Sequence, residues 1–270
     1  MNLIVTTFQY LKHRLQAKRW DSFHSPYLFR LFTSCCDDTN DATAYSEIEK
    51  KRIEFKNSAE TIERKDHGAG SLVSGSGKQQ KIAFIARHAL SRPFQCRFLA
   101  RLAQFTQAKT IIEFGSSLGI SAAYLSIGRP EAQVITVEGD PELAKRSKKV
   151  FKELGLTNTQ IVEATFEAFL STEINTISSI DLLFLDGNHQ SRALLSYYHA
   201  LKHLFTPDTI IIVDDIYWSR DMKDGWSTLI ALPEIKQSVD CYQFGLLFFN
   251  HDFIQKENHI IRLPWRSVYD

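Results

Sequence analysis

The stretch TIIEFGSSLG, residues 110–119, decides the fold of this 270-residue chain. A short apolar run typical of a buried strand leads into a turn with glycine at 115 and at 119, and a helical pattern then continues to Gly128. Gly115 allows a tight turn off the strand, and Gly119 allows the helix and a ligand to approach closely. The G-x-x-x-G spacing differs from the G-x-G-x-x-G that binds a pyrophosphate, and no P-loop lysine follows it. NAD, FAD and ATP are therefore disfavoured.

Strands and helices alternate on the C-terminal side of this stretch. Strand patterns fall at 110–115, 133–139, 159–165, 180–187, 209–215, 239–245 and 246–250. Helical patterns separate the first six, among them one that begins at Asp140-Pro141 and ends at Gly155. Repeated strand–helix units specify a parallel sheet with right-handed crossovers, and the last two strands, which no helix separates, can only pair antiparallel. The sequence predicts an α/β fold with a doubly wound, mostly parallel seven-stranded sheet and an antiparallel last strand.

Charge and composition exclude several classes of protein. Lys and Arg total 32 and Asp and Glu total 31, so the chain lacks the basic excess of proteins that coat nucleic acid or an anionic membrane. No stretch approaches the roughly 20 apolar residues that span a bilayer, and the first residues lack the order of a secretory signal. The four cysteines form no CxxC pair and are expected to be reduced and buried, without a disulfide framework or a zinc site. A cytoplasmic protein with no membrane partner is the expectation.

Residues 1–80 are expected to form an N-terminal helical extension, and residues 81–270 the main domain. Residues 1–36 carry five basic residues against one acid, with Phe8, Leu11 and Leu15 at helical spacing. Residues 66–80 contain glycine at 68, 70, 75 and 77, a composition that cannot pack a core and predicts a long functional loop. The extension could cover a site as a lid, and its apolar helix could equally contact a second copy in a homodimer.

A carboxylate at the end of the second strand indicates a nucleoside site. Glu138, followed by Gly139, comes 19 residues after Gly119. In an open α/β sheet a ligand binds beyond the carboxyl ends of the strands, and an acid at this position can accept hydrogen bonds from both ribose hydroxyls. The alternative is that Glu138 only compensates the dipole of the following helix.

Three further acids are expected to converge at the same edge of the sheet. Asp186 ends the fourth strand, and Asp214 and Asp215 end the fifth. Two bare carboxylates about 5 Å apart repel by on the order of 3 kcal/mol, which a cation or a shared proton would relieve. All-oxygen ligands suit Mg²⁺, Mn²⁺ or Ca²⁺. The alternative is that Asp214 and Asp215 only satisfy loop amides.

The motifs E-F-G-S-S-L-G, V-E-G-D, D-L-L-F-L-D-G and I-V-D-D, in this order, resemble a class I S-adenosylmethionine-dependent methyltransferase over roughly residues 81–250. Within that superfamily the chain is most similar to small-molecule O-methyltransferases of the catechol and macrolide-sugar type. The resemblance implies a Rossmann-like fold, S-adenosylmethionine as cofactor, and methyl transfer to a hydroxyl oxygen of a small-molecule acceptor.

The resemblance also assigns the parts of the site. It implies that Glu113 and the loop from Gly115 to Gly119, with Ser116 and Ser117, face the amino-acid part of the cofactor, and that Glu138 with Gly139 holds the ribose. Next to the adenine it places Ala164, Thr165 and Phe166. It further implies that Asp186 is a catalytic residue that also contacts the cofactor, and that Asp186, Asp214 and Asp215 carry a divalent metal that binds substrate oxygens. Glu113 could instead form a salt bridge at the mouth of the sheet.

The chemistry would be an in-line attack of an acceptor oxyanion on the sulfonium methyl group. His189, in the loop Gly187-Asn188-His189, has a suitable intrinsic pKa for a general base. The sugar methyltransferases often carry an acid at the position of Asn188, and this departure favours His189 as the base. A loop-capping role for His189 is the alternative.

Aromatic and histidine side chains are candidates for the acceptor side. Tyr217, Trp218 and Trp226 follow the acid pair and could form the wall of an acceptor pocket, or could pack their helix instead. His24, Asp66 and His67 belong to the extension and are lid candidates, with a surface loop as the alternative.

Three alternatives to O-methyl transfer remain open. An RNA-modifying methyltransferase could grip RNA with residues 1–36, but the N-P-P-Y motif of base methylation and paired aromatics for base stacking are absent, so a nucleic-acid partner is not expected. A non-catalytic S-adenosylmethionine-binding protein would keep the glycines and lose the acids, whereas this chain has both. An aminopropyl transferase is disfavoured because the resemblance extends through the Asp214-Asp215 pair.

Overall fold

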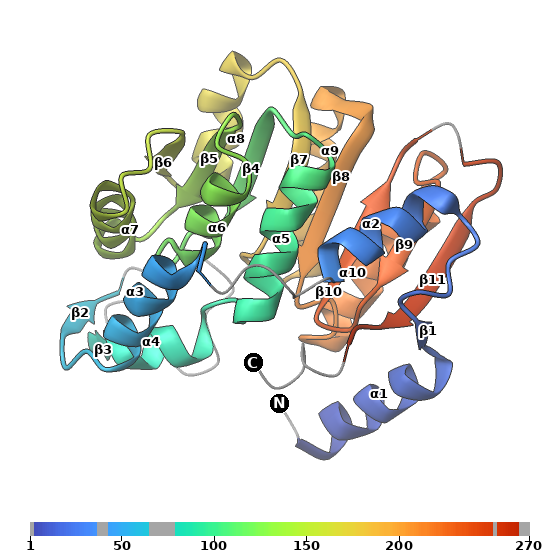
Figure 1. Ribbon diagram of the computed structural model, residues 1–270, viewed down its shortest axis with the longest axis horizontal. Coiled ribbons are helices and arrows are strands. Elements are labelled where there is room, and N and C mark those ends of the chain that lie inside the picture. The colour runs from blue at the N-terminus through green and yellow to red at the C-terminus, as the bar shows by residue number, and fades with distance from the viewer. Residues whose placement is uncertain (1–2, 37–42, 65–78, 251–252, 265–270) are drawn as a thin grey trace.

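A central sheet organises the molecule. The computed structural model describes residues 3–36, 43–64, 79–250 and 253–264, and nine strands of these residues form one sheet in the order β1-β11-β9-β10-β8-β7-β4-β5-β6 (Figure 1). Its strands are β1 (Lys18–Arg19), β4 (Thr110–Phe114), β5 (Gln133–Glu138), β6 (Thr159–Glu163), β7 (Ile180–Leu185), β8 (Phe205–Asp214), β9 (Gln237–Asp240), β10 (Phe244–Phe248) and β11 (Glu257–Arg262). A separate hairpin joins β2 (Thr61–Glu63) and β3 (Gln79–Lys81).

Helices cover both faces of the sheet. They are α1 (Leu3–Gln16), α2 (Pro26–Cys36), α3 (Ser46–Lys56), α4 (Ile82–His88), α5 (Pro93–Phe105), α6 (Ile120–Gly128), α7 (Pro141–Glu153), α8 (Phe166–Ser171), α9 (Ser191–Leu201) and α10 (Arg220–Ala231), with short 3-10 turns at Glu173–Thr176 and Lys202–Leu204. In Figure 1, α2, α5 and α6 lie in front of the sheet, whereas α9 and α10 belong to the opposite layer.

The predicted topology is confirmed. Strands β6, β5, β4, β7 and β8 pair parallel, and β10 pairs antiparallel with both β8 and β9. Two strands extend the predicted seven, because β11 pairs with β9 and β1 pairs with β11. β1 has two residues and β11 is partly polar, so neither strand shows the apolar pattern that would predict it from the sequence.

Two predicted boundaries were wrong. The turn between the last two strands lies at residues 241–243 instead of 245/246, because Tyr242 takes a left-handed conformation (φ 73°) and the amide of Cys241 donates to the carbonyl of Phe244. The strand predicted at 209–215 begins earlier, because Phe205 already pairs with Ile180 as the first residue of β8. The sequence does not indicate either boundary, because tyrosine is not a typical turn residue and an apolar residue fits the end of a helix as well as the start of a strand.

Alternation along the strands divides the core into two layers. Leu182 and Phe184 of β7 pack with α2 and α5, whereas Leu183 and Leu185 pack with α9 and α10. Both sets are almost fully buried, which explains why the strand reads as a continuous apolar run.

The N-terminal region contributes to this core. The side chains Leu28, Leu31 and Phe32 of α2 are fully buried in the same cluster as α5 and the sheet. Each such side chain stabilises the fold by about 1.5–3 kcal/mol. Leu11 and Leu15 of α1 are exposed. The division of the chain at residue 80 stays a prediction.

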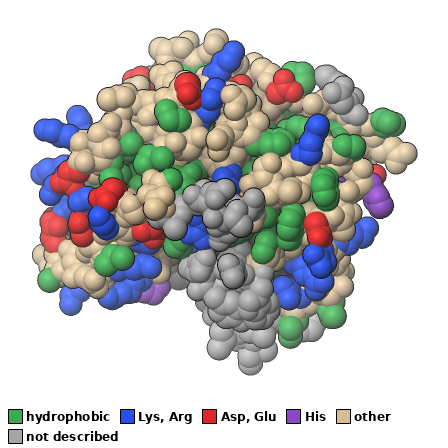
Figure 2. Space-filling model, viewed as in Figure 1, with side chains coloured by type: hydrophobic (Ala, Val, Ile, Leu, Met, Phe, Trp, Pro, Cys, Tyr) green, Lys and Arg blue, Asp and Glu red, His purple; other side chains and the backbone are tan. Residues whose placement is uncertain are grey.

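Helix α7 begins where the sequence predicted. The side chain of Asp140 accepts hydrogen bonds from the amides of Glu142 and Leu143, and Pro141 occupies the first helical position. This start places the end of β5 and the first turn of α7 side by side. The adjoining surface carries mixed charges, as Figure 2 shows on its left side, and includes a salt bridge of 3.0 Å between Lys51 of α3 and Glu153 of α7.

Two other sequence expectations concern the surroundings of the protein. Within the part of the chain that the structure describes, no helix is long and apolar enough to cross a membrane. The four cysteines are free and buried, as predicted.

Trp226 and Trp218 provide a matched test of the core packing. The indole of Trp226 is 4% exposed and fills the space beside Gly245, where an added Cβ would lie 2.4 Å from its ring, whereas Trp218 is 39% exposed. We expect Trp226→Ala to lower the free energy of unfolding by about 3–5 kcal/mol, because it leaves a cavity between α10 and β10. Trp218→Ala should change it by about 0.5 kcal/mol or less. Urea denaturation measures both, and equal effects of the two substitutions would contradict this packing.

Candidate active site

A cavity of about 570 Å³ opens at the carboxyl ends of the central strands. Residues that follow β4, β5, β7 and β8 meet there with the segment that joins α4 to α5. Its lining includes Gly115, Ser117, Glu138, Gly139, Asp140, Thr165, Phe166, Asp186, Gly187, Asn188, His189, Asp214, Asp215 and Trp218. The volume lies within the range of small-molecule sites. The cavity also lies where ligands bind in an open α/β sheet, beyond the carboxyl ends of the strands.

The glycine turn forms the floor of the cavity. Gly115 has a φ of +102°, and a Cβ there would lie 2.1 Å from the carbonyl oxygen of Asp186. Gly119 has a φ of +79°, and a Cβ there would lie 3.0 Å from Ser147 and Phe151 of α7. Among the described residues Gly119 belongs to the contact between α6 and α7 and is not part of the cavity lining, so its assignment to the cofactor stays a prediction.

Ser116 and Ser117 have different roles. Ser117 lines the cavity with a left-handed backbone (φ 49°). Ser116 is buried behind the turn, where its hydroxyl donates to the hydroxyl of Ser147 at 3.1 Å, and it is not part of the described cavity lining.

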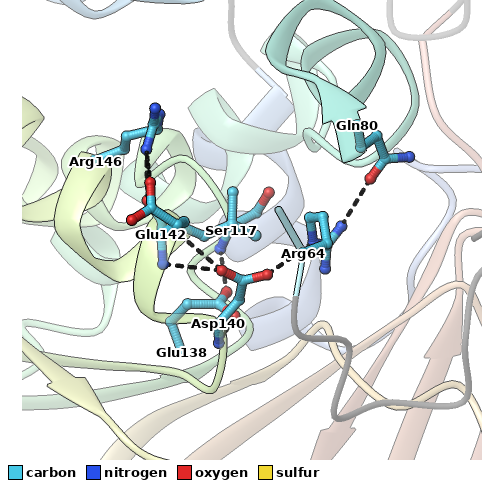
Figure 3. A network of polar contacts seen from close by, with 8 residues as sticks. Arg64, Gln80, Ser117, Glu138, Asp140, Glu142 and Arg146 are labelled. Carbon is cyan, nitrogen blue, oxygen red and sulfur yellow. Dashed lines mark hydrogen bonds and ion pairs between the residues drawn. The ribbon is translucent and has the colours of Figure 1, made fainter. Parts of the chain in front are cut away.

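Glu138 is fixed by two backbone amides. Its Oε2 accepts from the amide of Ser117 at 2.8 Å and its Oε1 from the amide of Asp140 at 2.9 Å (Figure 3). Each oxygen keeps a further lone pair for a ligand hydroxyl. Burial raises the pKa of Glu138, with the two amides opposing this effect. Asp140, not Glu138, caps α7, so the carboxylate of Glu138 remains directed at the cavity.

A salt bridge crosses from the hairpin to this corner. The Nε of Arg64, which follows β2, lies 3.0 Å from Oδ2 of Asp140, and its Nη1 donates to Oε1 of Gln80 at 3.3 Å (Figure 3). The sequence did not indicate Arg64, which lines the cavity beside Glu138.

Glu113 lies behind the cavity. It is fully buried and pairs in register with Thr136 on β5, whose hydroxyl donates to the Glu113 carboxylate. Burial raises the pKa of Glu113 to about 7, against the opposing hydrogen bonds of Ser121 and Thr136. The described residues of the lining do not include Glu113, because this β4 side chain points to the α6 face of the sheet.

The segment after β6 meets the expectation in part. Thr165 and Phe166 line the cavity, whereas Ala164 packs into the apolar cluster of the α9 face. Phe166 stacks on Phe114 with ring centroids 4.8 Å apart and an interplanar angle of 3°. A Cβ at Gly187 would lie 2.6 Å from the Phe166 ring, so the glycine after Asp186 makes room for this stack.

The three acids converge as predicted. Asp186, Asp214 and Asp215 all line the cavity, and burial together with the neighbouring carboxylates raises the pKa values of Asp186 and Asp214. Ser91 donates to Oδ2 of Asp186 at 3.3 Å, and Gln95 donates to Oδ1 of Asp214 at 2.7 Å. The structure therefore supplies protein donors where the sequence suggested a cation.

The metal assignment remains a prediction. Over residues 3–36, 43–64, 79–250 and 253–264, no group of three or more His, Cys, Asp or Glu side chains is arranged to hold a metal ion. The donor chemistry of the three acids still suits a hard cation, because all their ligating atoms are oxygens.

His189 and Trp218 form the wall next to the acids. Nε2 of His189 lies 3.9 Å from Oδ2 of Asp215, and its ring centroid lies 5.4 Å from that of Trp218. Burial lowers the pKa of His189 and so favours the neutral imidazole. The charge of Asp215 opposes this shift. Asn188, in a left-handed conformation (φ 49°), donates to the hydroxyl of Tyr197 at 3.1 Å and so fixes the loop.

Several predicted acceptor residues lie elsewhere. The hydroxyl of Tyr217 donates to Asp240 at 2.7 Å, and its ring stacks on Tyr242, so it faces away from the cavity. Trp226 packs in the core beside Gly245, and His24 is exposed ahead of α2 and outside the described lining. Asp66 and His67 lie outside the described residues.

Part of the cavity wall went unpredicted. The end of α4 and the start of α5 supply Arg87, His88, Ala89, Leu90, Ser91, Arg92 and Gln95. The only local signal is the helix start at Arg92-Pro93, which says nothing about a ligand. These residues precede the first central strand, and only the packing of α5 against the sheet brings them to its carboxyl edge.

Comparison with known proteins agrees with this geometry. Residues 112–216 match the profile of a family described as a methyltransferase domain. This stretch contains the glycine turn, Glu138 and all three acids of the cavity. Residues 112–216 therefore form a methyltransferase domain. The resemblance inferred from its motifs is confirmed.

The relatives of the methyltransferase domain are distant. A catechol O-methyltransferase of Niastella koreensis is 27% identical over 139 residues, which are 50% of this chain and 62% of the relative. An O-methyltransferase from Bacillus cereus in complex with S-adenosylhomocysteine has 20% identity and a TM-score of 0.53 over 59% of this chain and 82% of that one. An S-adenosylhomocysteine-bound methyltransferase from Podospora anserina has 17% identity and a TM-score of 0.55, over 84% and 97%. The chain thus spans less than two thirds of the curated relative, and the solved structures establish the fold.

Glu113 gives the methyltransferase domain a pH-dependent stability. A carboxyl whose folded pKa lies above its unfolded value binds its proton more tightly in the folded state. The contribution of Glu113 is therefore present below pH 4.5 and is lost as the pH rises to about 7. The difference of about 2.5 in pKa corresponds to about 3 kcal/mol.

We expect Glu113→Gln to remove this part of the pH dependence, since the amide oxygen can still accept from Thr136. Urea unfolding at pH 5, 6, 7 and 8 would show the stability of the variant increasing relative to the wild type as the pH rises. Parallel pH profiles of the two proteins would show that Glu113 does not titrate in this range.

Proposed function

We propose that this protein transfers a methyl group from S-adenosylmethionine to a hydroxyl oxygen of a small molecule. The observation that carries the proposal is that one cavity joins the corner of Ser117 and Glu138 to an acid cluster flanked by His189 and Trp218. The donor and the acceptor of a group transfer have to lie in one space, with the reacting atoms in contact.

The cofactor side is supported by Glu138, Thr165 and Phe166. The Glu138 carboxylate, held by two amides, has free lone pairs for the two ribose hydroxyls, while Phe166 and Thr165 border the adjacent part of the cavity. When bound, S-adenosylmethionine supplies a methyl group on a positively charged sulfur, so that an acceptor oxygen can bond to carbon while the carbon–sulfur electron pair remains on sulfur.

The acceptor side is supported by His189 and Trp218. A neutral imidazole on the cavity wall can accept the proton of the acceptor hydroxyl, and Asp215, at 3.9 Å, would stabilise the resulting imidazolium. The exposed face of Trp218 offers an apolar surface for a planar or sugar-sized acceptor. The similarity to a catechol O-methyltransferase supports oxygen as the atom that is methylated.

A divalent cation is the finer part of the proposal. Asp186, Asp214 and Asp215 would hold it, since burial raises the pKa values of all three carboxyl groups and the neighbouring carboxylates raise those of Asp186 and Asp214 further. Such a cation would lower the pKa of the acceptor hydroxyl. Gln95 and Ser91, which donate to two of these acids, would stay as the ligands' outer hydrogen-bond partners. The four free, buried thiols support a location in a reducing compartment such as the cytoplasm.

Methyl transfer can be tested directly. Incubation with S-adenosylmethionine and a panel of catechols, phenols and sugars should give acceptors that gain one methyl group by mass spectrometry. Glu138→Gln should raise the Kd for S-adenosylmethionine by about tenfold or more, because each ribose bond to a charged acceptor contributes about 1.5–3 kcal/mol.

Glu142→Gln is the matched control. It removes an acid of the same region that pairs with Arg146 on the helix surface and lies outside the described cavity lining. Equal affinities of Glu138→Gln and the wild type would contradict the cofactor site, and the absence of any methylated product would contradict the proposed activity.

Chelation tests the cation. Removal of divalent metals with EDTA should lower turnover by about tenfold or more, with recovery on addition of Mg²⁺, and Asp214→Asn should lose activity in the same range. Asp208→Asn, an exposed acid on the same strand, should leave turnover unchanged. Full turnover in EDTA together with an active Asp214→Asn would show that the acids work without a metal.

A further inference from the structure

A buried arginine of the N-terminal region reaches the loop on the cavity wall. Arg52 lies on α3 and is 2% exposed. Its Nη1 donates to the carbonyl oxygen of Ser91 at 2.7 Å, and its Nη2 lies 3.4 Å from the sulfur of Cys96. Arg52 itself is not part of the described cavity lining.

The guanidinium is held on its other side by a carboxylate. Nε of Arg52 lies 2.9 and 3.1 Å from the two oxygens of Glu49, and the hydroxyl of Tyr124 donates to the same carboxylate at 2.8 Å. Tyr124 is fully buried on α6, where it stacks on Tyr45 with ring centroids 4.4 Å apart. Arg52 is therefore fixed to α6, the helix that follows the glycine turn.

The burial of this guanidinium suggests a reason beyond stability. The Arg52 side chain is 3% exposed and that of Glu49 30%, and taking an arginine out of water costs free energy that a well-packed apolar side chain would not cost. The planar guanidinium, however, presents donors in fixed directions, so that one group can bind a carboxylate and a backbone carbonyl together. The arrangement gives the Ser91 carbonyl a defined position.

Ser91 transmits this position to the reaction centre. Its carbonyl is held by Arg52, and its hydroxyl donates to Oδ2 of Asp186 at 3.3 Å. The backbone of Asp186 is confined on another side, because its carbonyl oxygen lies against Gly115. The orientation of the Asp186 carboxylate then depends on what contacts its oxygens.

We propose that Arg52 is a positioning residue for methyl transfer: through the Ser91 carbonyl it holds the Ser91 hydroxyl on the carboxylate of Asp186. The proposal rests on the proposed function, in which Asp186 belongs to the acceptor side of the cavity. It gives α3 a role in the reaction that needs no contact with either substrate.

Kinetics of four variants test the path. Arg52→Lys keeps the charge but loses the fork that spans Glu49 and Ser91, and Ser91→Ala loses the hydroxyl. Each should lower kcat by up to about 100-fold, as expected for a displaced reacting group, with little change in the KM for S-adenosylmethionine. Ser91→Thr, which restores a hydroxyl, should recover most of the loss. The double variant Arg52→Lys with Ser91→Ala should be no slower than the slower single variant.

Lys50→Met is the matched control, since Lys50 lies on the same helix in an exposed salt bridge with Glu47 and should leave kcat unchanged. An unchanged kcat in Arg52→Lys, or losses that multiply in the double variant, would overturn the proposal. A general loss of stability would lower the active fraction of each variant alike and would not be recovered by Ser91→Thr.

Crystal structures of the wild type and Arg52→Met separate this proposal from the proposed function. We expect the Ser91 hydroxyl to leave Asp186 in the variant while the sheet is unchanged. A Ser91 hydroxyl still bonded to Asp186 in Arg52→Met overturns the inference whatever the enzyme catalyses. If the wild type methylates no acceptor, the proposed function fails, and the position of Ser91 in the variant still decides whether Arg52 sets it.

Discussion

The close contact between Gly115 and the backbone of Asp186 is the constraint on which the site depends. A Cβ at residue 115 would lie 2.1 Å from the Asp186 carbonyl oxygen, so only glycine allows the end of β4 to pass this close to the end of β7. The glycine turn therefore meets the backbone of Asp186, one member of the acid cluster, at this contact. Both lie in the lining of the cavity, so the contact holds the proposed cofactor and acceptor parts of the site together.

Electrostatics then shape the cavity. Burial raises the pKa values of Glu113, Glu138, Asp186 and Asp214, so the carboxyl end of the sheet concentrates groups that are costly to ionise. Each has its own hydrogen-bond donors: Thr136 for Glu113, two amides for Glu138, Ser91 for Asp186 and Gln95 for Asp214. Perturbed acids in a cleft are typical of functional sites. Of the three that line the cavity, Glu138 lies in the part proposed to bind the cofactor, and Asp186 and Asp214 lie in the part proposed to bind the acceptor. Ser91 and Gln95 both come from the segment at the start of α5, which makes that helix a structural partner of the acids.

The sequence predicted the position of a residue well where the backbone alone sets that position. It predicted less well on which side of its strand or turn a side chain lies. The ends of β4, β5, β7 and β8 were predicted closely enough to place Gly115, Glu138, Asp186 and Asp214 at one edge, because parallel strands end together. Glu113 and Ala164 were assigned to the site from the resemblance, but strand alternation and packing turn them into the interior. Tyr217 and Trp226 come after Asp215, whose φ of +52° turns the chain. After this turn Trp218 lies at the cavity, whereas the hydroxyl of Tyr217 donates to Asp240.

The sequence by itself determined the alternating strands and helices, the glycine turn and the acids at the strand ends, since these follow from local periodicity and from residues with special backbone freedom. It also determined, through the order of its motifs, the methyltransferase domain. Tertiary structure alone decided which residues from outside that order reach the cavity. Three of these residues line the cavity and come from segments that precede β4: Arg64, Ser91 and Gln95. Arg52, also ahead of β4, reaches the cavity wall by its hydrogen bond to Ser91. Only the packing of α3, α4 and α5 brings these segments to the strand ends. Contacts between segments so far apart in the chain leave no periodic trace in either segment, because each obeys its own helix or loop pattern while their meeting depends on the whole core.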